Sequence, residues 1–508
     1  MSAFIIANMA PLMFGALVLF LLCGYPVAFA LGANGLLFGL LGIELGLFHV
    51  ELFQALPERV FGIMRNETLL AIPFFTFMGL ILERSGMAED LLDTIGQLFG
   101  PMRGGLAYAV VFVGALLAAT TGVVAASVIS MGLISLPIML RYGYDPRLAT
   151  GVIAASGTLA QIIPPSLVLI IMADQLGRSV GDMYQGAMVP GLLLTAMYAG
   201  FIILTSIFRP NAAPALPPEA RTLRGFKLFQ RVLFSLVPPL VLIFLVLGTI
   251  FIGIATPTEA GAMGAAGALA LALIRRRLSL DLLKQAMEST AKLSSFVLFI
   301  LIGSTVFGLV FRAVNGDLWV EHLLTGLPGG VIGFLIVVNI LVFALAFFLD
   351  FFELAFIIVP LLGPVAEKLG IDLIWFGVLL AVNMQTSFMH PPFGFALFFL
   401  RSVAPKDDYT DKVSGKRIKG IKTTDIYWGA IPFVCIQIIM VALVIFFPSL
   451  VEGGLDKRTK IDVDTIQLNI EAPAYGDPTS SDTPALPEDG PEDPMEALKR
   501  QLEEQNTR

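Results

Sequence analysis

Two Pro–Pro pairs, each set among polar residues inside an apolar stretch, are the positions of this sequence best suited to binding chemistry. They occur in "GTLAQIIPPSLVL" (157–169) and "SFMHPPFGFAL" (387–397). A proline within a helix removes a backbone hydrogen bond and clashes with the preceding turn, and lipid offers no replacement partner. Each pair therefore predicts a membrane helix that is interrupted. Carbonyl groups freed before Pro164 and Pro391 suit a cation such as Na⁺, and the half-helix N-termini that follow suit a carboxylate. A packing kink without a ligand is the alternative.

Hydroxyl, amide and small residues flank the first Pro–Pro pair. Hard cations prefer oxygen ligands, and glycine lets the backbone approach a ligand closely. The alternative is that each hydroxyl only bonds to its own helix. From this region the predicted Na⁺ ligands are Thr120, Thr121, Gly122, Ser156, Gly157 and Ile163, and the predicted substrate-binding residues are Ser127, Gln161, Pro165 and Ser166.

The second Pro–Pro pair follows a dense polar run and comes after two acidic residues in an apolar segment. Ionisable groups at membrane depth are costly and usually functional, although the two acids could instead pair with one another or with His390. Glu259, in "ATPTEAG", is expected to cap its own helix. The predicted Na⁺ ligands here are Leu349, Asp350, Glu353, Asn383, Thr386 and Met389, and the predicted substrate-binding residues are Gln385, Ser387, His390 and Pro392.

The composition indicates a polytopic all-α membrane protein. Of the 508 residues 56% are hydrophobic and 14% charged, against about 25% charged in soluble proteins. Apolar runs long enough to span a bilayer recur to about residue 448. With three histidines and no HExxH, CxxC or phosphate-binding loop, we expect no enzyme, no cofactor beyond Na⁺ as coupling ion, and no nucleic-acid partner. The residues from 449 to 508 are acidic and proline-rich, which predicts a disordered tail.

The sequence contains a diverged internal repeat. Gly79 and Pro26 in the first half correspond to Gly308 and Pro257 in the second. At a constant separation of 227 residues, Pro137, Gly143, Asp145, Pro164 and Pro165 match Pro364, Gly370, Asp372, Pro391 and Pro392. Such a repeat is typical of secondary transporters.

The loop charges predict that the two copies are inverted in the membrane. The central loop 209–231 and the stretch 275–292 are basic and should be cytoplasmic, whereas the counterpart of the latter, 44–67, is acidic and should lie outside. The N-terminus and the acidic tail are then periplasmic. Consistent loop placement also requires the segments 105–140 and 330–368 to enter and leave on one side, as re-entrant hairpins with tips at 119–127 and 348–354. Full spans in a shifted topology are the competing account.

These elements define the expected organisation. Spans are expected near 9–24, 26–43, 68–83, 188–208, 231–252, 257–274, 292–312 and 428–448, and broken helices at 147–174 and 372–403. The expected parts are a first scaffold segment with an interfacial helix (1–104), a first transport-domain half (105–187), a second scaffold segment (188–329), a second transport-domain half (330–404), a cytoplasmic loop and last span (405–448) and the tail (449–508).

Several long motifs resemble those of a known family, in the same order along the chain. "FTFMGLILERSGMAEDLLDTIG", "GYDPRLATGVIAASGTLAQIIPPS", "GIATPTEAGAMGA" and "LGIDLIWFGVLLAVNMQTSFMHPPFGFALFFLRSVAP" are similar to the large membrane subunit of tripartite ATP-independent periplasmic (TRAP) transporters. The resemblance covers most of residues 10–448. The variant with "FFELAF" and "MHPPFG" resembles the subgroup named for mannitol or chloroaromatic compounds.

The resemblance implies a fold of the ion-transporter superfamily with a scaffold and a mobile transport domain, in a bacterial inner membrane. It also implies Na⁺-driven, elevator-like uptake of an organic acid, with a small membrane subunit and a periplasmic substrate-binding protein as partners. Family members often carry "SGSAxAD" at the first hairpin, where this chain reads "TTGVVAAS". Gly122 is retained, but Ser127 stands in the place of the aspartate, so an ion role cannot be transferred from it.

The resulting expectation is a Na⁺-coupled importer of a carboxylate, held between the two broken helices and the hairpin tips. A stand-alone symporter of the same superfamily is the first alternative. An intramembrane enzyme using Asp350, Glu353 and His390 as acid–base groups and a non-transporting sensor that signals through the acidic tail are more remote ones.

Overall fold

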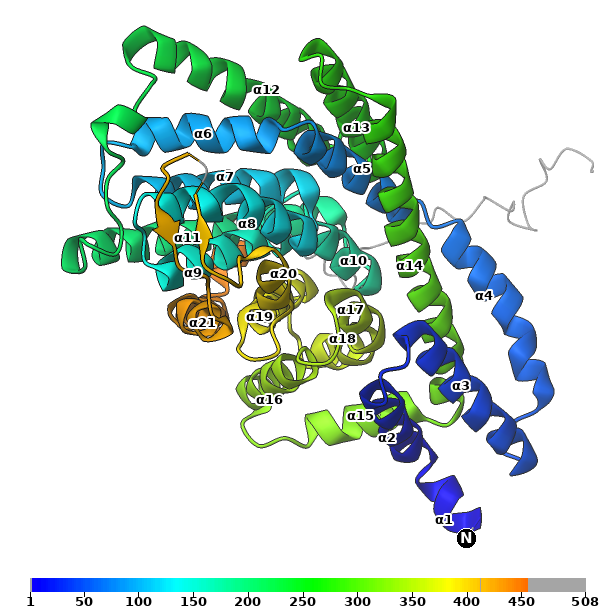
Figure 1. The fold of residues 1–508 in the computed structure, drawn as a ribbon. Helices are drawn as coiled ribbons and strands as arrows, with labels where there is room; N and C mark the ends of the chain where they lie inside the picture. The colour runs from blue at the N-terminus through cyan, green and yellow to red at the C-terminus, as the bar shows by residue number, and fades with distance from the viewer. Residues whose placement is uncertain (1, 412, 456–508) are drawn as a thin grey trace, which may run out of the picture. The chain divides into compact units, whose positions relative to one another are not determined.

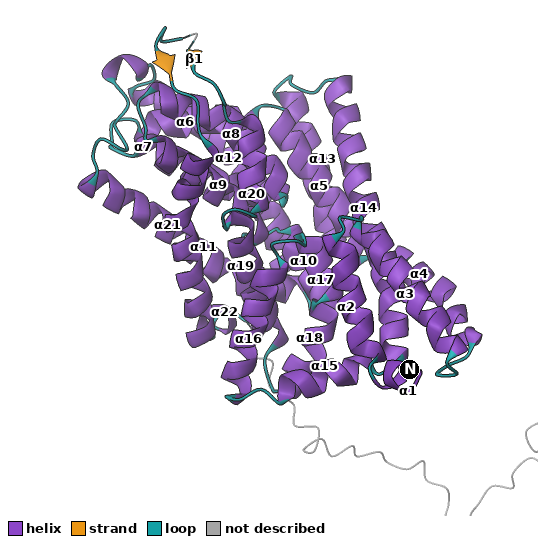
Figure 2. Cartoon of the chain, turned by 60° about the horizontal axis from the view of Figure 1, so that its bottom comes forward, coloured by secondary structure: helices purple, strands orange, loops and turns teal. Residues whose placement is uncertain are grey.

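The chain folds almost entirely into helices. The structure, a computed structural model, describes residues 2–411 and 413–455; the side chains at positions 2, 3, 120 and 121 also lie outside the description. Of the expected tail 449–508, residues 456–508 lie outside the described residues, whereas its first residues form the short helix α22 (Ser449–Glu452). In the described part, seven helices are long and apolar enough to cross a membrane, and two further bent pairs meet the same criteria together (Figures 1 and 2).

The first half of the chain supplies the helices up to the central loop. In order they are α1 (Ser2–Ala7), α2 (Met9–Leu22), α3 (Val27–Glu44), the 3₁₀ turn η1 (Val50–Gln54), α4 (Ala55–Met64), η2 (Thr68–Leu70), α5 (Ala71–Arg84), α6 (Met87–Phe99), α7 (Gly105–Thr121), α8 (Val124–Arg141), α9 (Pro146–Thr158), η3 (Leu159–Gln161), α10 (Leu167–Gln175) and α11 (Val180–Phe208).

The second half repeats this series with one added β-ribbon. Its elements are η4 (Pro218–Ala220), α12 (Gly225–Phe251), α13 (Pro257–Ile274), α14 (Leu280–Ala313), α15 (Gly316–Thr325), α16 (Gly330–Leu345), α17 (Phe351–Ile357), α18 (Val359–Lys368), α19 (Leu373–Met389), α20 (Phe395–Val403), β1 (Tyr409–Thr410), β2 (Arg417–Ile418), α21 (Thr423–Phe446) and α22 (Ser449–Glu452). The strands pair antiparallel, with Tyr409 opposite Ile418.

Short polar side chains cap the N-termini of α9, α19 and α13. Asp145 caps α9 by accepting a hydrogen bond from the backbone N–H of Arg147 at 2.8 Å, and its repeat counterpart Asp372 caps α19 by accepting from Ile374 at 2.8 Å. Thr256 and Glu259 form a reciprocal capping box at the start of α13. The expectation that Glu259 caps its own helix is confirmed.

Contacts between helices come in reciprocal pairs, which is the signature of a two-fold relation. For four pairs in which a first-half helix packs on a second-half helix, the counterparts of both also pack together. The reciprocal pairs are α3–α14 with α13–α5, α2–α15 with α12–α6, α9–α21 with α19–α11, and α10–α19 with α20–α9. The repeat inferred from the prolines therefore extends to the whole described fold.

The two helical hairpins open at opposite ends of the molecule. Hairpin 1 (α7 and α8) ends at Arg141, whose guanidinium pairs with Asp411 in the loop that carries β1 and β2. Hairpin 2 (α16 to α18) ends at Lys368, which pairs with Glu321 on α15, and α15 packs on α2. Figure 2 shows β1 at one end and the N-terminus with α15 at the other. The fold class expected from the sequence, an all-α polytopic membrane protein of inverted repeats with two hairpins and two broken helices, is confirmed.

Some expected bounds differ from those observed. Helix α11 begins at Val180 instead of residue 188 because Ser179 caps it, accepting from the backbone N–H of Asp182 at 3.3 Å. The expected boundary between residues 187 and 188 therefore falls inside one continuous helix, which packs on α10, α19 and α21. Helix α14 likewise begins at Leu280, not 292, behind the cap Ser279. In the segment 44–67, where an interfacial helix is expected, η1 and α4 form, and α4 has no buried residue.

Candidate functional site

Break 1 (residues 162–166) interrupts the first broken helix in the interior of the protein. Helix α9 ends at Thr158, one 3₁₀ turn follows, and α10 starts at Leu167. Every residue from 159 to 166 is buried. The hydroxyl of Ser166 donates to the carbonyl of Gln161 at 2.8 Å and accepts from the N–H of Val168 at 3.2 Å. Ser166 is expected to bind substrate. Its hydroxyl instead bonds to a carbonyl before the break and to an N–H after it, and so connects the two half-helices.

Break 2 (residues 390–394) interrupts the second broken helix but is less covered. Helix α19 ends at Met389 and α20 starts at Phe395, while Pro392 and Phe393 are exposed. The His390 ring stacks on Phe347 at 4.9 Å between centroids and meets the edge of Phe343 at 5.1 Å. Its Nδ1 is buried and makes no hydrogen bond within the described residues. The Pro–Pro bonds of both breaks are cis.

The tip of hairpin 1 contacts the start of the second half-helix at break 1. Gly122 joins α7 to α8 in the left-handed conformation with φ +59°. A Cβ atom at Gly122 would lie 3.2 Å from the backbone nitrogen of Leu167, the first residue of α10. A Cβ atom at Gly157 would lie 2.3 Å from Cγ2 of Val128 on α8. The two glycines allow hairpin 1 to pack closely against the broken helix. Ser127, on α8 of this hairpin, is fully buried.

The expected side chains of Thr120 and Thr121 lie outside the described residues. Ser156, also an expected Na⁺ ligand, is fully buried, and its Oγ has no hydrogen-bond partner within the described part of the chain. The same holds for Oε1 of Gln161. Two buried oxygen atoms near break 1 are thus available to a ligand, as a cation site requires.

The tip of hairpin 2 faces break 2 through aromatic rings. Phe347 and Phe348 each pack on Phe393, at 5.7 and 6.0 Å between ring centroids. The two acids just after this tip form a capping box at the start of α17. The N–H of Glu353 donates to Asp350 Oδ1 at 3.0 Å, and the N–H of Asp350 donates to Glu353 Oε2 at 2.8 Å. Each carboxylate thus accepts a hydrogen bond from the backbone of the other residue. The role of these acids as Na⁺ ligands stays a prediction, and it would use their second oxygens.

The polar run before break 2 is tied to its own helix and to hairpin 2. The hydroxyl of Thr386 donates to the carbonyl of Val382 at 3.2 Å. The amide of Asn383 donates to the carbonyl of Asn339 on α16 at 2.8 Å, and Ser387 lies 3.5 Å from the carbonyl of Phe343. Leu349, Met389 and Ile163 are buried apolar residues, so they can offer only backbone oxygens.

A buried polar cluster joins the two broken helices on the pseudo-two-fold axis. The amide nitrogen of Gln385 lies 3.3 Å from the hydroxyl of Thr158, a residue 227 positions earlier and therefore its repeat counterpart. A residue can touch its own counterpart only at the axis. Gln437 on α21 completes the cluster, because its amide nitrogen lies 3.4 Å from Thr158 and donates to the hydroxyl of Tyr198 on α11 at 2.8 Å. All four side chains are 0% exposed.

The sequence reasoning missed Tyr198 and Gln437. A lone glutamine in the apolar run "PFVCIQIIMV" is the signal that could have indicated Gln437. The oxygen atoms Oε1 of Gln385 and Gln437 have no partner within the described residues. The axis cluster therefore has unused hydrogen-bonding capacity and is not purely a packing contact.

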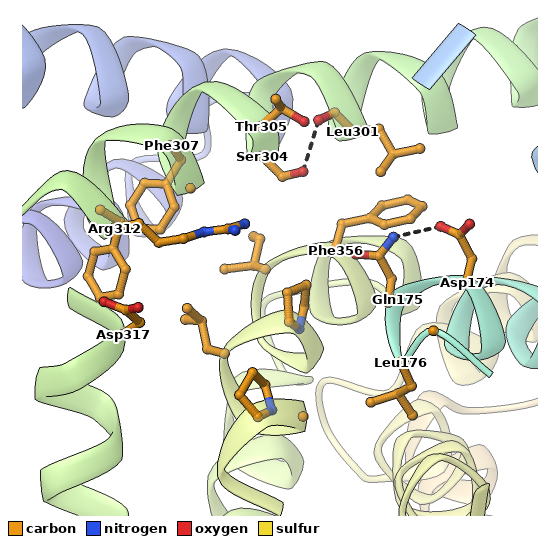
Figure 3. A pocket seen from close by; sticks show the side chains of 18 of the residues that line it. Asp174, Gln175, Leu176, Leu301, Ser304, Thr305, Phe307, Arg312, Asp317 and Phe356 are labelled. Carbon is orange, nitrogen blue, oxygen red and sulfur yellow. Dashed lines mark hydrogen bonds between the residues drawn. The ribbon is translucent and has the colours of Figure 1, made fainter. Parts of the chain in front are cut away.

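A cavity of 640 Å³ lies apart from both breaks, between α14 and the group α10, α17 and α18. None of the expected site residues whose side chains are described lines it. Figure 3 shows Arg312 extending from α14 into this cavity, with Asp174 and Gln175 of α10 on the opposite side. The carboxylate of Asp174 also accepts a hydrogen bond from the amide of Asn66 at 2.6 Å. The cavity separates the long helix α14 from the elements that carry the breaks.

Comparisons with known proteins agree on one family. The profile described as "Tripartite ATP-independent periplasmic transporter, DctM component" matches residues 14–450. The C4-dicarboxylate TRAP transporter large permease protein DctM of Rhodobacter capsulatus is 32% identical over 409 residues, which cover 77% of this chain and 89% of the relative. The sialic acid TRAP transporter large permease protein SiaM of Vibrio cholerae is 28% identical, covering 84% of this chain and 94% of the relative.

Among solved structures, the YdaH transporter of Alcanivorax borkumensis superposes with a TM-score of 0.52 at 15% sequence identity. The match covers 78% of this chain and 88% of that chain. At this identity the likeness concerns the fold alone.

Proposed function

Because this chain belongs to the family of DctM components of tripartite ATP-independent periplasmic transporters, we propose that it imports a small organic acid in symport with Na⁺. It is a multi-pass membrane protein and the large permease subunit of such a transporter. The observation that carries the proposal is the pair of broken helices. Their interrupted peptide groups lie next to the hairpin tips, buried at break 1 and partly exposed at break 2, where a ligand replaces the missing hydrogen bonds.

One Na⁺ site forms at each break. At break 1 the ligands are backbone carbonyls before Pro164 together with the oxygens of Ser156 and Gly122. At break 2 they are backbone carbonyls before Pro391 and the free carboxylate oxygens beyond the tip of hairpin 2. This assignment is supported by the contact of Gly122 with the start of α10. It is also supported by the unpartnered Oγ of Ser156.

The carboxylate binds between the two breaks, at the half-helix N-termini. Each N-terminus presents free N–H groups and the positive end of a helix dipole. A proton on the unpartnered Nδ1 of His390 adds a hydrogen-bond donor for the carboxylate. Relatives named for C4-dicarboxylate and sialic acid support an acid as the substrate.

Transport proceeds by an elevator-like movement of the helices that carry the breaks against the rest. The cavity between α14 and α10, α17 and α18 supports a sliding boundary there. Na⁺ and substrate bias this movement because they bind the two conformations with different affinity. The basic loops lie in the cytoplasm of a bacterium and the N-terminus in the periplasm, where a substrate-binding protein delivers the acid; a small membrane subunit completes the complex.

The test is uptake by the purified transporter in proteoliposomes, with a panel of labelled organic acids. We expect uptake of at least one acid to require both an inward Na⁺ gradient and the periplasmic binding protein. Uptake that needs Na⁺ but not the binding protein would favour the stand-alone symporter. Uptake that is equally fast with K⁺ in place of Na⁺ would refute the ion sites at both breaks.

A further inference from the structure

A groove with aromatic walls runs between α11 and α21 on the outer side of the helices that carry the breaks. Its volume is 500 Å³. Several of its apolar side chains are exposed, among them Phe208 at 78%, Trp428 at 59% and Leu204 at 55%. The hydroxyl of Thr205 is satisfied by the carbonyl of Phe201 at 2.8 Å. The walls therefore offer hydrocarbon and ring surface, which suits an acyl chain.

One end of the groove carries fixed charges of both signs. Arg209, at the C-terminal end of α11, and Asp145, at the start of α9, both line it. Within the described residues Arg209 makes no ion pair. Asp145 uses one oxygen, Oδ1, to cap α9, which leaves Oδ2 unbonded. Arg147, also in the lining, is already paired with Asp425 at 3.3 Å.

Backbone hydrogen bonds connect the residues that carry these two charges. The N–H of Asp145 donates to the carbonyl of Ala212 at 3.0 Å, and the N–H of Ala212 donates to the carbonyl of Arg209 at 2.9 Å. The loop after α11 is thereby fixed against the start of α9. A free guanidinium and a free carboxylate oxygen thus lie at the same end of an apolar groove.

We propose that this groove is a binding site for a phospholipid with an ethanolamine headgroup. Its phosphate pairs with Arg209, its ammonium group with Asp145, and one acyl chain lies between Leu204, Phe208 and Trp428. Guanidinium groups bind phosphate through directed, charge-assisted hydrogen bonds, and basic pockets between membrane helices bind lipid headgroups. Tryptophan near the end of a membrane span is enriched in the lipid headgroup region.

The charge pattern selects this lipid over other occupants. An anionic headgroup such as glycerol phosphate would place no positive charge near Asp145 and would leave its carboxylate facing another anion. A choline headgroup carries the charge but has no N–H to donate. Free phosphate would use Arg209 and leave the apolar walls uncovered.

The test is lipid binding by the purified full-length protein, delipidated and titrated with defined lipids in native mass spectrometry. We expect phosphatidylethanolamine to bind more tightly than phosphatidylcholine or phosphatidylglycerol. Arg209→Gln should weaken binding of all phospholipids about tenfold, the loss typical of one charge-assisted hydrogen bond. Asp145→Asn, which still caps α9, should abolish the preference for ethanolamine while keeping phospholipid binding.

The matched control is Arg224→Gln, because Arg224 is an exposed arginine of the same loop that does not line the groove. It should bind lipid as the native protein does. Leu204→Trp, which fills the groove, gives a second variant that does not alter charge and should lose the lipid. Binding unchanged in Arg209→Gln, equal loss in Arg224→Gln, or a preference for phosphatidylglycerol would overturn the proposal. Displacement of the lipid by inorganic phosphate alone would also overturn it.

Discussion

Replacing Gly122 by alanine should impair Na⁺-driven uptake, because Gly122 is where the tip of hairpin 1 meets the start of α10. Its φ of +59° lies in the left-handed region, where an L-residue with a Cβ costs about 1–2 kcal/mol. The new Cβ would also lie 3.0 Å from Cγ and 3.2 Å from the nitrogen of Leu167. Since carbon contacts normally settle at about 3.5–4.0 Å, the tip must move away from the break by several tenths of an ångström.

The matched control separates this displacement from backbone strain. Gly143 also has a left-handed conformation, with φ +81°, but a Cβ there would meet nothing within 4 Å. Gly143→Ala therefore carries a similar conformational cost without any displacement. If closing the tip over bound Na⁺ becomes about 1 kcal/mol harder in Gly122→Ala, the Na⁺ concentration for half-maximal uptake rises about fivefold.

The assay is uptake in proteoliposomes at varied external Na⁺, with the amount of folded protein in the membrane measured for each variant. We expect the Na⁺ requirement to rise in Gly122→Ala and to stay at the native value in Gly143→Ala. An unchanged Na⁺ dependence in Gly122→Ala would refute the placement of an ion site beneath this tip. So would an equal rise in both variants, since that would trace the effect to strain alone.

Three further predictions concern the break, the axis cluster and the loop pair. Pro164→Ala combined with Pro165→Ala should allow the helix to continue and abolish uptake while surface labelling shows normal insertion; native uptake would contradict the role of the break. Gln437→Leu should lower the melting temperature in detergent, because it leaves buried hydroxyls without their donor at a cost of about 1–3 kcal/mol, and an unchanged melting temperature would contradict this. The guanidinium of Arg141, followed by Ser414, holds the pKa of Asp411 below its ordinary value of 3.8, so the pair stabilises the loop above that pH and loses its effect as the pH falls. The difference in melting temperature between native protein and Arg141→Gln should therefore shrink on acidification, and a difference that grows would refute it.

Local sequence signals were enough for the elements around the breaks. Prolines lack the N–H that a helix interior needs, and the pairs that begin at Pro164 and Pro391, set among polar residues, mark the two interruptions. Pro238 and Pro239 lie inside the continuous helix α12, so a Pro–Pro pair alone does not break a helix. Asp145 and Asp372 start their helices for an equally local reason, since the side chain bonds to a backbone group two residues on.

Roles that depend on distant partners could not be predicted. Tyr198 and Gln437 are 239 residues apart, and only the packing of α11 on α21 brings them together. The position of Arg312 in the cavity likewise depends on the tertiary packing that places α14 opposite α10.

The contact between Thr158 and Gln385 has a consequence for how the two halves of this chain can change over time. In a dimer of identical subunits, a position on the axis faces its own copy and must be compatible with itself. Joining the halves into one polypeptide removes that restriction, and here it has allowed a hydroxyl to meet an amide. The freedom is bounded, however, because a mutation at either position is immediately a mutation in the environment of the other. The sequences of the two halves can diverge independently at their outer surfaces, but the two residues at this contact must change together.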